Sequence, residues 1–249
     1  RKEGGENFHL SPNYLYLDKK NIHKSLNDFS IVKLHEYNIN KSANFKINKI
    51  PNLSSIRKEI DFKFINKFFE INKKKIIILI AGGSQGATIF DNIIPKSLNL
   101  LPLQIKKNIE VYHQCSKHNF DSVKRNYSKN KIKCTCKVFF NNLPDIMFKS
   151  QFVVSRSGAS TLSEMTALGK PTILIPYKFA KKNHQEKNAE WLVNKGAAIM
   201  LLEDELTVEK LKNEIMTFIV NKKKLKKMSK NSFSLGDSMS LLKLSRLIY

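Results

Sequence analysis

Short apolar runs alternate with helical stretches along the chain from Lys73 onward. The best defined runs are continuously apolar, which is typical of strands buried on both faces of a parallel sheet. Strands are predicted at Lys75–Ile80, Ile109–Gln114, Lys131–Phe139, Phe152–Ser155, Thr172–Pro176 and Ala197–Leu202. Helices are predicted near Thr88–Leu98, His118–Tyr127, Pro144–Lys149, Ala159–Leu168 and His184–Asn194, with three helical segments from Val208 onward. This order predicts an α/β fold, a Rossmann-like parallel sheet with helices on both faces.

The first part of the chain lacks this regularity. Residues 1 to about 50 are rich in Lys, Asn and Ser, and only Asp28–Val32 and Phe45–Ile50 hint at extended structure. We therefore expect residues 1–72 to be an N-terminal segment and linker, and residues 73–249 to form one domain. Because the chain begins with Arg1, we expect a fragment or a processed form.

The chain is strongly basic, with a formal net charge of +23. Such a charge favours nucleotides, nucleic acid or an anionic membrane surface, although a lysine- and asparagine-rich composition also arises from AT-biased coding. The lysine run Lys222–Lys230 fits a solvated helix face or a contact with anionic lipid. The longest apolar run, Ile76–Ala81, is far shorter than the roughly 20 residues that span a bilayer, so we expect any membrane contact to be peripheral.

Three cysteines, Cys115, Cys134 and Cys136, fit a reducing compartment better than a disulfide scaffold. Cys134 and Cys136 are predicted to share one face of a strand. A metal site at this pair needs further ligands that the sequence does not indicate, so none is predicted.

The segment from Ser155 to Glu164 has the pattern of a phosphate-binding turn. A buried strand runs through small residues directly into a helix, whose first amide groups are left unpaired with the positive end of the helix dipole behind them. Ser157, Ser160, Thr161 and Glu164 are spaced along one helix face, and Leu162 and Met165 are expected to face the core. A nucleoside diphosphate fits, with phosphate at the turn and ribose near Glu164, but an exposed helix with a Ser/Thr-rich first turn fits equally well.

A glycine turn, residues 82–87, follows the first strand. It lacks the Lys-Ser/Thr pair of a P-loop, and no acidic residue ends the second strand as in a dinucleotide site. Both this turn and the one at Ser157 follow carboxyl ends of strands, so we expect them at the same rim of the sheet.

A polar loop and the start of a helix follow the strand that ends at Pro176. The amide side chains of Gln185 and Asn188 suit sugar hydroxyls, because each offers a donor and an acceptor. Helix capping explains them equally well, and His184 fits a cap or a surface residue better than a catalyst.

Taken together, the motifs at residues 82–87, 112–114, 156–164 and 184–189 resemble the MurG family of bacterial transferases, in glycosyltransferase family 28. The resemblance covers roughly residues 54–248. It implies the GT-B fold, two Rossmann-like domains facing a cleft, with this chain supplying mainly the C-terminal, donor-binding one. It further implies an inverting hexosyltransferase that moves N-acetylglucosamine from UDP-N-acetylglucosamine to the lipid-linked muramyl-pentapeptide acceptor of peptidoglycan synthesis, lipid I to lipid II.

The resemblance also implies a donor site. Ser84 would contact phosphate, the backbone at Phe140 would hold the uracil edge, and Gln185 would read the sugar. Arg57 matches an arginine that touches the nucleotide, although the motif before it departs from the family pattern. The diphosphate and ribose would be bound by the remaining site residues, Ala159, Ser160, Thr161, Leu162, Ser163 and Glu164.

The resemblance implies no cofactor, no metal and no nucleic acid partner, and it implies peripheral attachment to the cytoplasmic face of the bacterial inner membrane. The family's acceptor-binding glycine loop, which supplies the probable base, has no counterpart in residues 1–72, so no catalytic residue is nominated. Two alternatives remain open. One is a donor-binding subunit with another acceptor or a separate acceptor-binding partner, and the other is a non-catalytic nucleotide-binding module.

Overall fold

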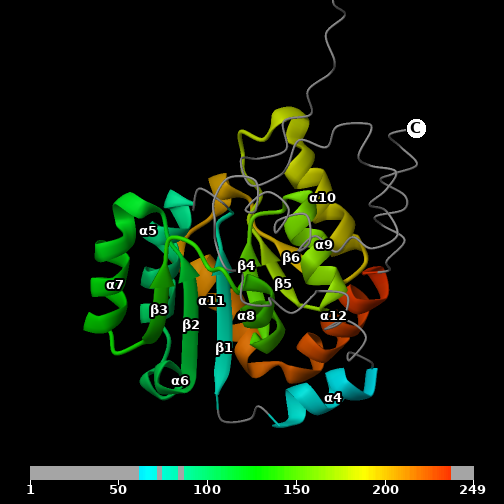
Figure 1. Cartoon of the computed structure of the whole chain (residues 1–249), viewed down its shortest axis with the longest axis horizontal. Coiled ribbons are helices and arrows are strands. Elements are labelled where there is room, and N and C mark those ends of the chain that lie inside the picture. The colour runs from blue at the N-terminus through cyan, green and yellow to red at the C-terminus, as the bar shows by residue number, and fades with distance from the viewer. Residues whose placement is uncertain (1–61, 72–74, 84–86, 237–249) are drawn as a thin grey trace, which may run out of the picture.

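A computed structural model describes residues 62–71, 75–83 and 87–236 of the chain. The described residues form one six-stranded sheet of order β3-β2-β1-β4-β5-β6, in which all neighbouring strands are parallel (Figure 1). The strands are β1 (Ile76–Ala81), β2 (Ile109–Gln114), β3 (Lys133–Lys137), β4 (Phe152–Ser155), β5 (Thr172–Leu174) and β6 (Ala198–Met200). All six predicted strands are confirmed, with β3, β5 and β6 shorter than predicted.

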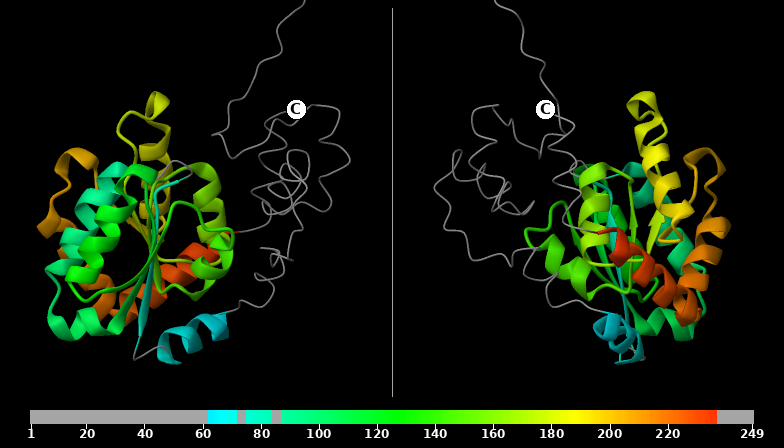
Figure 2. Two further views of the ribbon diagram at one scale, coloured as in Figure 1. Left: turned by 60° about the vertical axis from the view of Figure 1, so that its left-hand side comes forward. Right: turned by 90° about the vertical axis from the view of Figure 1, so that its right-hand side faces the viewer.

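Helices cover both faces of the sheet (Figure 2). One face carries α5, α7 and α11, and the other carries α8, α9 and α12. The longer helices are α5 (Thr88–Asn99), α7 (Phe120–Lys129), α9 (Ala159–Ala167), α10 (His184–Asn194), α11 (Val208–Val220) and α12 (Lys222–Leu235). The shorter ones are α4 (Phe62–Ile71), α6 (Leu103–Asn108) and α8 (Leu143–Lys149), with single 3₁₀ turns at Lys117–Asn119, Lys181–Asn183 and Glu203–Glu205.

The predicted helices of the β/α repeat are confirmed, whereas α4 and α6 were not predicted. Of the three helical segments expected from Val208 onward, the described residues contain α11 and α12, and the remainder lies outside them. The extended pieces expected at Asp28–Val32 and Phe45–Ile50 also lie outside the described residues.

The core lies between the sheet and these two helix layers. Every residue of β4 is buried, as are Ile78, Leu79 and Ile80 of β1, which explains why the central strands are continuously apolar. Burying an aliphatic side chain contributes roughly 1.5 to 3 kcal/mol, so these two strands anchor the fold. Their carboxyl ends are thereby held in fixed positions.

Helix α4 belongs to the segment that the sequence analysis set apart as N-terminal linker, yet it packs on this core. Ile65 and Phe69 are buried, and the Phe64 ring stacks on Phe148 of α8 with 5.5 Å between ring centroids. The Lys170 ammonium lies 4.6 Å from the centroid of Phe68. Helix α4 is therefore packed against the domain at the edge of the sheet where the strands begin.

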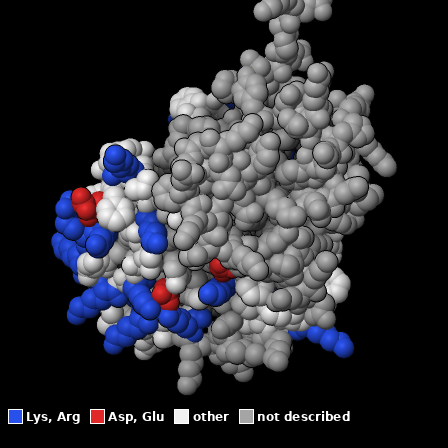
Figure 3. Space-filling view, viewed as in Figure 1, with Lys and Arg blue, Asp and Glu red and all other residues white. Residues whose placement is uncertain are grey.

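Basic side chains are concentrated on one part of the described surface. Lys and Arg side chains gather at the end of the molecule that carries α6, α7 and β3 (Figure 3). None of the helices in the described ranges has the length and apolar character needed to cross a bilayer.

Candidate functional site

The strand order places one crevice at the carboxyl edge of the sheet. The chain leaves β1 toward β2 on one side and later returns to β4 on the other, so β1 and β4 flank the topological switch point at which open α/β sheets bind ligands. Ala81 and Ser155 are paired at the ends of these two strands. The prediction that the two small-residue turns share one rim is therefore confirmed.

The glycine turn begins directly after Ala81. Gly83 has φ +83°, a left-handed conformation that glycine adopts without the strain imposed by a side chain. Ser84 lies in residues 84–86, outside the described residues, and so does Arg57. Their predicted contacts with the nucleotide stay predictions.

The second turn opens α9 with its amide groups unpaired. Gly158 is the N-cap in an extended conformation, and no side chain caps the helix. The first helical bond runs from Leu162 N to the Gly158 carbonyl, so the preceding N–H groups, at Ala159, Ser160 and Thr161, have no partner within the helix. A Cβ built at Gly158 would meet no atom within 4 Å, which leaves space for a ligand at the amide groups. This arrangement suits a phosphate.

Ser157 holds this turn against α10 instead of facing outward. Its side chain is fully buried, and its hydroxyl donates a 2.7 Å hydrogen bond to the Gln185 carbonyl. In return, the side-chain amide of Asn188 donates to the Ser157 carbonyl at 3.0 Å. Ser157 was expected to share a polar helix face with Ser160 and Glu164, but it precedes α9 and its hydroxyl is used inside the protein. The Asn188 Nδ2 group thus has a contact within the protein, and the sugar contact considered for this residue stays a prediction.

Gln185 is oriented by a backbone contact. Its Oε1 atom accepts a 3.0 Å hydrogen bond from Tyr177 N, so its Nε2 group is left as the donor available to a ligand. The neighbouring His184 is exposed, and its Nδ1 lies 2.8 Å from the Lys181 carbonyl, as expected for a residue at the start of a helix.

Arg156 stabilises the loop that carries Tyr177, a role that the sequence analysis missed. Its guanidinium donates to the carbonyls of Ile175 and Pro176 at 3.0 Å and forms an ion pair with Glu203. It also lies 4.9 Å from the ring centroid of Phe90 and 5.3 Å from that of Tyr177. Arg156 and Glu203 are far apart in the sequence, so no local pattern predicts their ion pair and only the folded structure reveals it.

Glu164 lies in the second turn of α9, about 10 Å from the Ser157 turn at 1.5 Å per residue. It forms no ion pair or hydrogen bond with the described residues, and burial raises the pKa of its carboxyl to about 7. Leu162 and Met165 are buried, so their predicted place in the core is confirmed. A desolvated carboxylate without a partner in the described ranges is suited to accept hydrogen bonds from two hydroxyl groups of a ligand.

Phe140 follows β3 at the same rim. Its ring is buried and lies 6.2 Å from that of Tyr112, and no hydrogen bond within the described residues uses its backbone N–H or carbonyl. Three strand spacings separate β3 from β4, about 14 Å. An elongated ligand could therefore contact the backbone at Phe140 with one end and the α9 amide groups with the other.

The rim thus brings together the predicted residues of α9, Gln185 and the loop of Phe140. The described residues show no cluster of acidic side chains at this rim that could hold a metal. The predicted pairing of thiols on one strand face is confirmed, because Cys134 Sγ and Cys136 Sγ lie 3.3 Å apart on β3.

Comparisons with known proteins agree with this geometry. The family model described as the glycosyltransferase family 28 C-terminal domain matches residues 77–242. A relative from Wolbachia sp. subsp. Brugia malayi (strain TRS) is 32% identical over 176 residues, covering 68% of this chain and 51% of the relative. A relative from Paramagnetospirillum magneticum is 38% identical over 136 residues, covering 55% of this chain and 37% of the relative. Both are named UDP-N-acetylglucosamine--N-acetylmuramyl-(pentapeptide) pyrophosphoryl-undecaprenol N-acetylglucosamine transferase.

Solved structures give the same fold. The crystal structure of Acinetobacter baumannii MurG has a TM-score of 0.67 and 20% identity, covering 86% of this chain and 62% of that one. The C-terminal CMP-Kdo binding domain of WaaA from the same species has a TM-score of 0.51 and 10% identity, covering 73% of this chain and 98% of that one. At these identities the likeness concerns the fold alone, and it confirms the predicted GT-B type of domain. The chain spans about half the length of the curated relatives it matches.

Proposed function

The chain belongs to glycosyltransferase family 28, through that family's C-terminal domain, and on this premise we propose that it binds UDP-N-acetylglucosamine as the donor half of an inverting transferase. The acceptor in this proposal is the lipid-linked muramyl-pentapeptide of peptidoglycan synthesis. The names of the relatives support both substrates. The observation that carries the proposal is the uncapped start of α9 beside the end of β1.

The proposed chemistry follows from that position. A muramyl hydroxyl attacks the anomeric carbon of the sugar in line, the bond to the diphosphate breaks, and negative charge accumulates on the departing UDP. The amide groups of Ala159, Ser160 and Thr161 stabilise that charge, because they are already oriented before the reaction. Such fixed donors often lower a barrier by several kcal/mol.

Each remaining site residue has one role in this proposal. Glu164 accepts hydrogen bonds from the ribose hydroxyls, Gln185 Nε2 donates to the sugar, and the backbone at Phe140 binds the uracil edge. Ser84 and Arg57 contact phosphate and nucleotide. Leu162 supports the helix from the core, whereas Ser163 lies beside Glu164 on α9. The catalytic base is assigned to none of the described residues.

We also propose a peripheral contact with the anionic cytoplasmic face of the bacterial inner membrane. Lys222, Lys223 and Lys227 are exposed along α12, and the chain as a whole carries a formal net charge of +23. Clustered lysines near a membrane surface gain about 1 kcal/mol each from anionic lipid. Co-sedimentation with phosphatidylglycerol vesicles, but not with phosphatidylcholine vesicles, is expected at low salt.

A second candidate function keeps the donor site and assigns acceptor binding to another polypeptide. The observation in its favour is that the family model matched is that of the C-terminal domain. In that case the chain would bind UDP-N-acetylglucosamine alone and transfer the sugar only with its partner.

The direct test is transfer of labelled N-acetylglucosamine to a lipid-linked muramyl acceptor, with and without an added N-terminal domain from a relative. Transfer by the chain alone, or only with the added domain, supports the first proposal. Binding of UDP-N-acetylglucosamine without transfer in either case supports the second candidate. If calorimetry detects binding of single-stranded RNA but of neither UDP nor the sugar nucleotide, the chain is a nucleic-acid-binding module and both candidate functions are refuted.

A further inference from the structure

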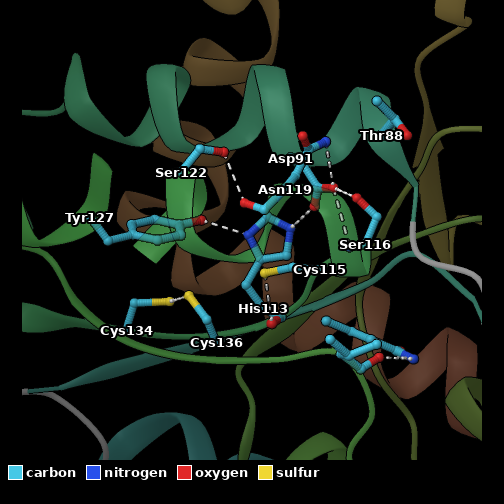
Figure 4. Close-up of polar contacts among 12 residues, drawn as sticks. Thr88, Asp91, His113, Cys115, Ser116, Asn119, Ser122, Tyr127, Cys134 and Cys136 are labelled. Atoms are coloured by element: carbon cyan, nitrogen blue, oxygen red, sulfur yellow. Dashed lines mark hydrogen bonds and ion pairs between the residues drawn. The ribbon is translucent and has the colours of Figure 1, made fainter. Parts of the chain in front are cut away.

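A cluster of buried polar side chains lies between β2 and α5, on the face of the sheet that α5 and α7 cover (Figure 4). Asp91 comes from α5, His113 comes from the end of β2, and Cys115 directly follows that strand. One ligand atom from each residue lies within 4.8 Å of the other two, and all three residues are buried. Nothing in the proposed function uses this cluster.

Two atoms of the cluster have no hydrogen-bond partner among the described residues. They are Asp91 Oδ1 and His113 Nε2, and both side chains are fully buried. The two atoms face each other at 3.5 Å, which is long for a charge-assisted hydrogen bond of about 2.7 to 2.9 Å. It is close to the ~3.3 Å that separates two ligands of a tetrahedral Zn²⁺ at bond lengths of about 2.0 to 2.1 Å.

The opposite sides of Asp91 and His113 are held by neighbours. Asp91 Oδ2 accepts hydrogen bonds from Ser116 N at 3.2 Å, from the Ser116 hydroxyl and from Asn119 Nδ2 at 3.1 Å. His113 Nδ1 lies 3.0 Å from the Tyr127 hydroxyl. Metal ligands in proteins are oriented in this way, with the non-ligating atom fixed by a second group. If Nδ1 carries the proton and donates it to Tyr127, Nε2 presents a lone pair toward Asp91 Oδ1.

We propose that Asp91, His113 and Cys115 bind a Zn²⁺ ion between β2 and α5. The oxygen, nitrogen and sulfur donors match the ligand types of Zn²⁺. Binding releases the Cys115 thiol proton, and the charges of one carboxylate and one thiolate then balance the ion. That balance matters because an uncompensated charge is costly in a fully buried position.

All three ligands are buried, which indicates a structural role for the ion, and a tetrahedral ion would complete its coordination with one further group such as a water molecule. Asp91 lies in the first turn of α5, shortly after the glycine turn, so the ion would fix the start of α5 to the end of β2.

The experiment uses the full chain, prepared in Zn²⁺-supplemented medium and then dialysed. Elemental analysis is expected to find one Zn²⁺ per chain. Substitution by Co²⁺ is expected to give visible bands of a tetrahedral ion and a thiolate-to-cobalt charge-transfer band. At about 100 times the dissociation constant, Zn²⁺ should raise the melting temperature by roughly 5 to 10 °C.

Matched cysteine variants identify the thiolate. Cys115→Ala should abolish the charge-transfer band and the thermal shift, whereas Cys134→Ala on the neighbouring strand should leave both in place. If the Asp91→Asn and His113→Gln variants fold, their Zn²⁺ affinity should be at least 10-fold lower than that of the wild type. If they do not fold, the loss of the charge-transfer band in Cys115→Ala still tests the proposal.

Absence of stoichiometric Zn²⁺, of the Co²⁺ bands and of the thermal shift would overturn the proposal and leave Asp91, His113 and Tyr127 as a buried polar cluster. A band lost in Cys134→Ala and retained in Cys115→Ala would also overturn it, because the ion would then lie at the thiol pair of β3.

Discussion

The Ser157 hydroxyl donates a 2.7 Å hydrogen bond to the carbonyl of Gln185, 28 residues further along the chain. This bond, together with the one from Asn188, joins the turn before α9 to the first turn of α10. The two segments would contact different parts of the proposed donor, the diphosphate and the sugar. Their relative position is therefore set by the protein before any ligand binds.

Replacing Ser157 by Ala should weaken UDP binding without removing any predicted contact to the ligand. The variant leaves the Gln185 carbonyl without its donor, and loss of such a bond costs about 1 kcal/mol of unfolding free energy. We expect a several-fold increase in the dissociation constant of UDP, measured by calorimetry. Ser128→Ala, at an exposed position on α7, is the control and should bind UDP as the wild type does. Unchanged affinity in Ser157→Ala would show that the junction does not position the diphosphate.

Glu164→Ala should weaken UDP binding by about 1.5 to 3 kcal/mol, because the ribose would lose hydrogen bonds to a charged acceptor. Glu164→Gln keeps the shape of the side chain and should lose part of that affinity. A comparison of UDP with 2′,3′-dideoxyuridine diphosphate provides a control on the ligand. Removal of the ribose hydroxyls should lower the affinity of Glu164→Ala less than it lowers the affinity of the wild type. Equal losses in both proteins would place the ribose elsewhere.

The raised pKa of Glu164 predicts a pH dependence of donor binding. With a pKa of about 7, the carboxyl is mostly neutral at pH 6 and mostly ionised at pH 8, and the ionised form is the better acceptor. Affinity for UDP-N-acetylglucosamine should therefore rise by up to about 10-fold between these pH values. The sugar nucleotide is used because its diphosphate is a diester and does not titrate in this range. Glu164→Gln should show no such rise.

The sequence was sufficient to predict the sheet because its strands are buried on both sides. Continuous apolar runs such as Phe152–Ser155 need no tertiary context to be recognised. Helix α6 has six residues, too few for a helical period to be visible. The aromatic side chains of α4 contact Phe148 and Lys170, which lie far along the chain, so local sequence does not indicate this packing.

The site was predictable at the level of backbone and less so at the level of side chains. A strand followed by small residues and a helix predicts unpaired amide groups wherever it occurs, and α9 has them. Residue type alone cannot say which partner a polar side chain chooses. The sequence therefore does not indicate that the Ser157 hydroxyl and the Asn188 amide donate to backbone carbonyls, or that Arg156 pairs with Glu203.

Gln185→Glu should separate recognition of the sugar from recognition of the nucleotide. The glutamate retains an oxygen to accept the Tyr177 N–H but lacks the Nε2 donor. We expect the ratio of affinities for UDP-N-acetylglucosamine and UDP to fall by up to about 10-fold, since a lost hydrogen bond costs about 0.5 to 1.5 kcal/mol, whereas the added negative charge opposes both ligands. Glu186→Gln, on the next residue of α10, controls for charge. A ratio that is unchanged in Gln185→Glu would remove Gln185 from the sugar site.

Lys170→Met tests what holds α4 and α8 to the domain. The buried ammonium donates to the carbonyls of Phe148 and Ser150, at 2.6 and 3.1 Å, and lies over the ring of Phe68 in α4. Methionine fills similar space but leaves both carbonyls without a donor, so we expect the unfolding free energy to fall by about 1 to 3 kcal/mol in urea denaturation.

The same variant should reveal a pH dependence with a definite sign. Burial lowers the pKa of Lys170 to about 7 from an ordinary value of 10.5. Between these values the unfolded chain binds a proton that the folded chain releases, so this lysine favours folding more as the pH rises from 7 toward 10. The difference in unfolding free energy between wild type and Lys170→Met should therefore be larger at pH 9 than at pH 6.5. Exposed Lys195→Met should show no such change, and a difference that shrinks with rising pH would mean that Lys170 stays charged in the folded protein.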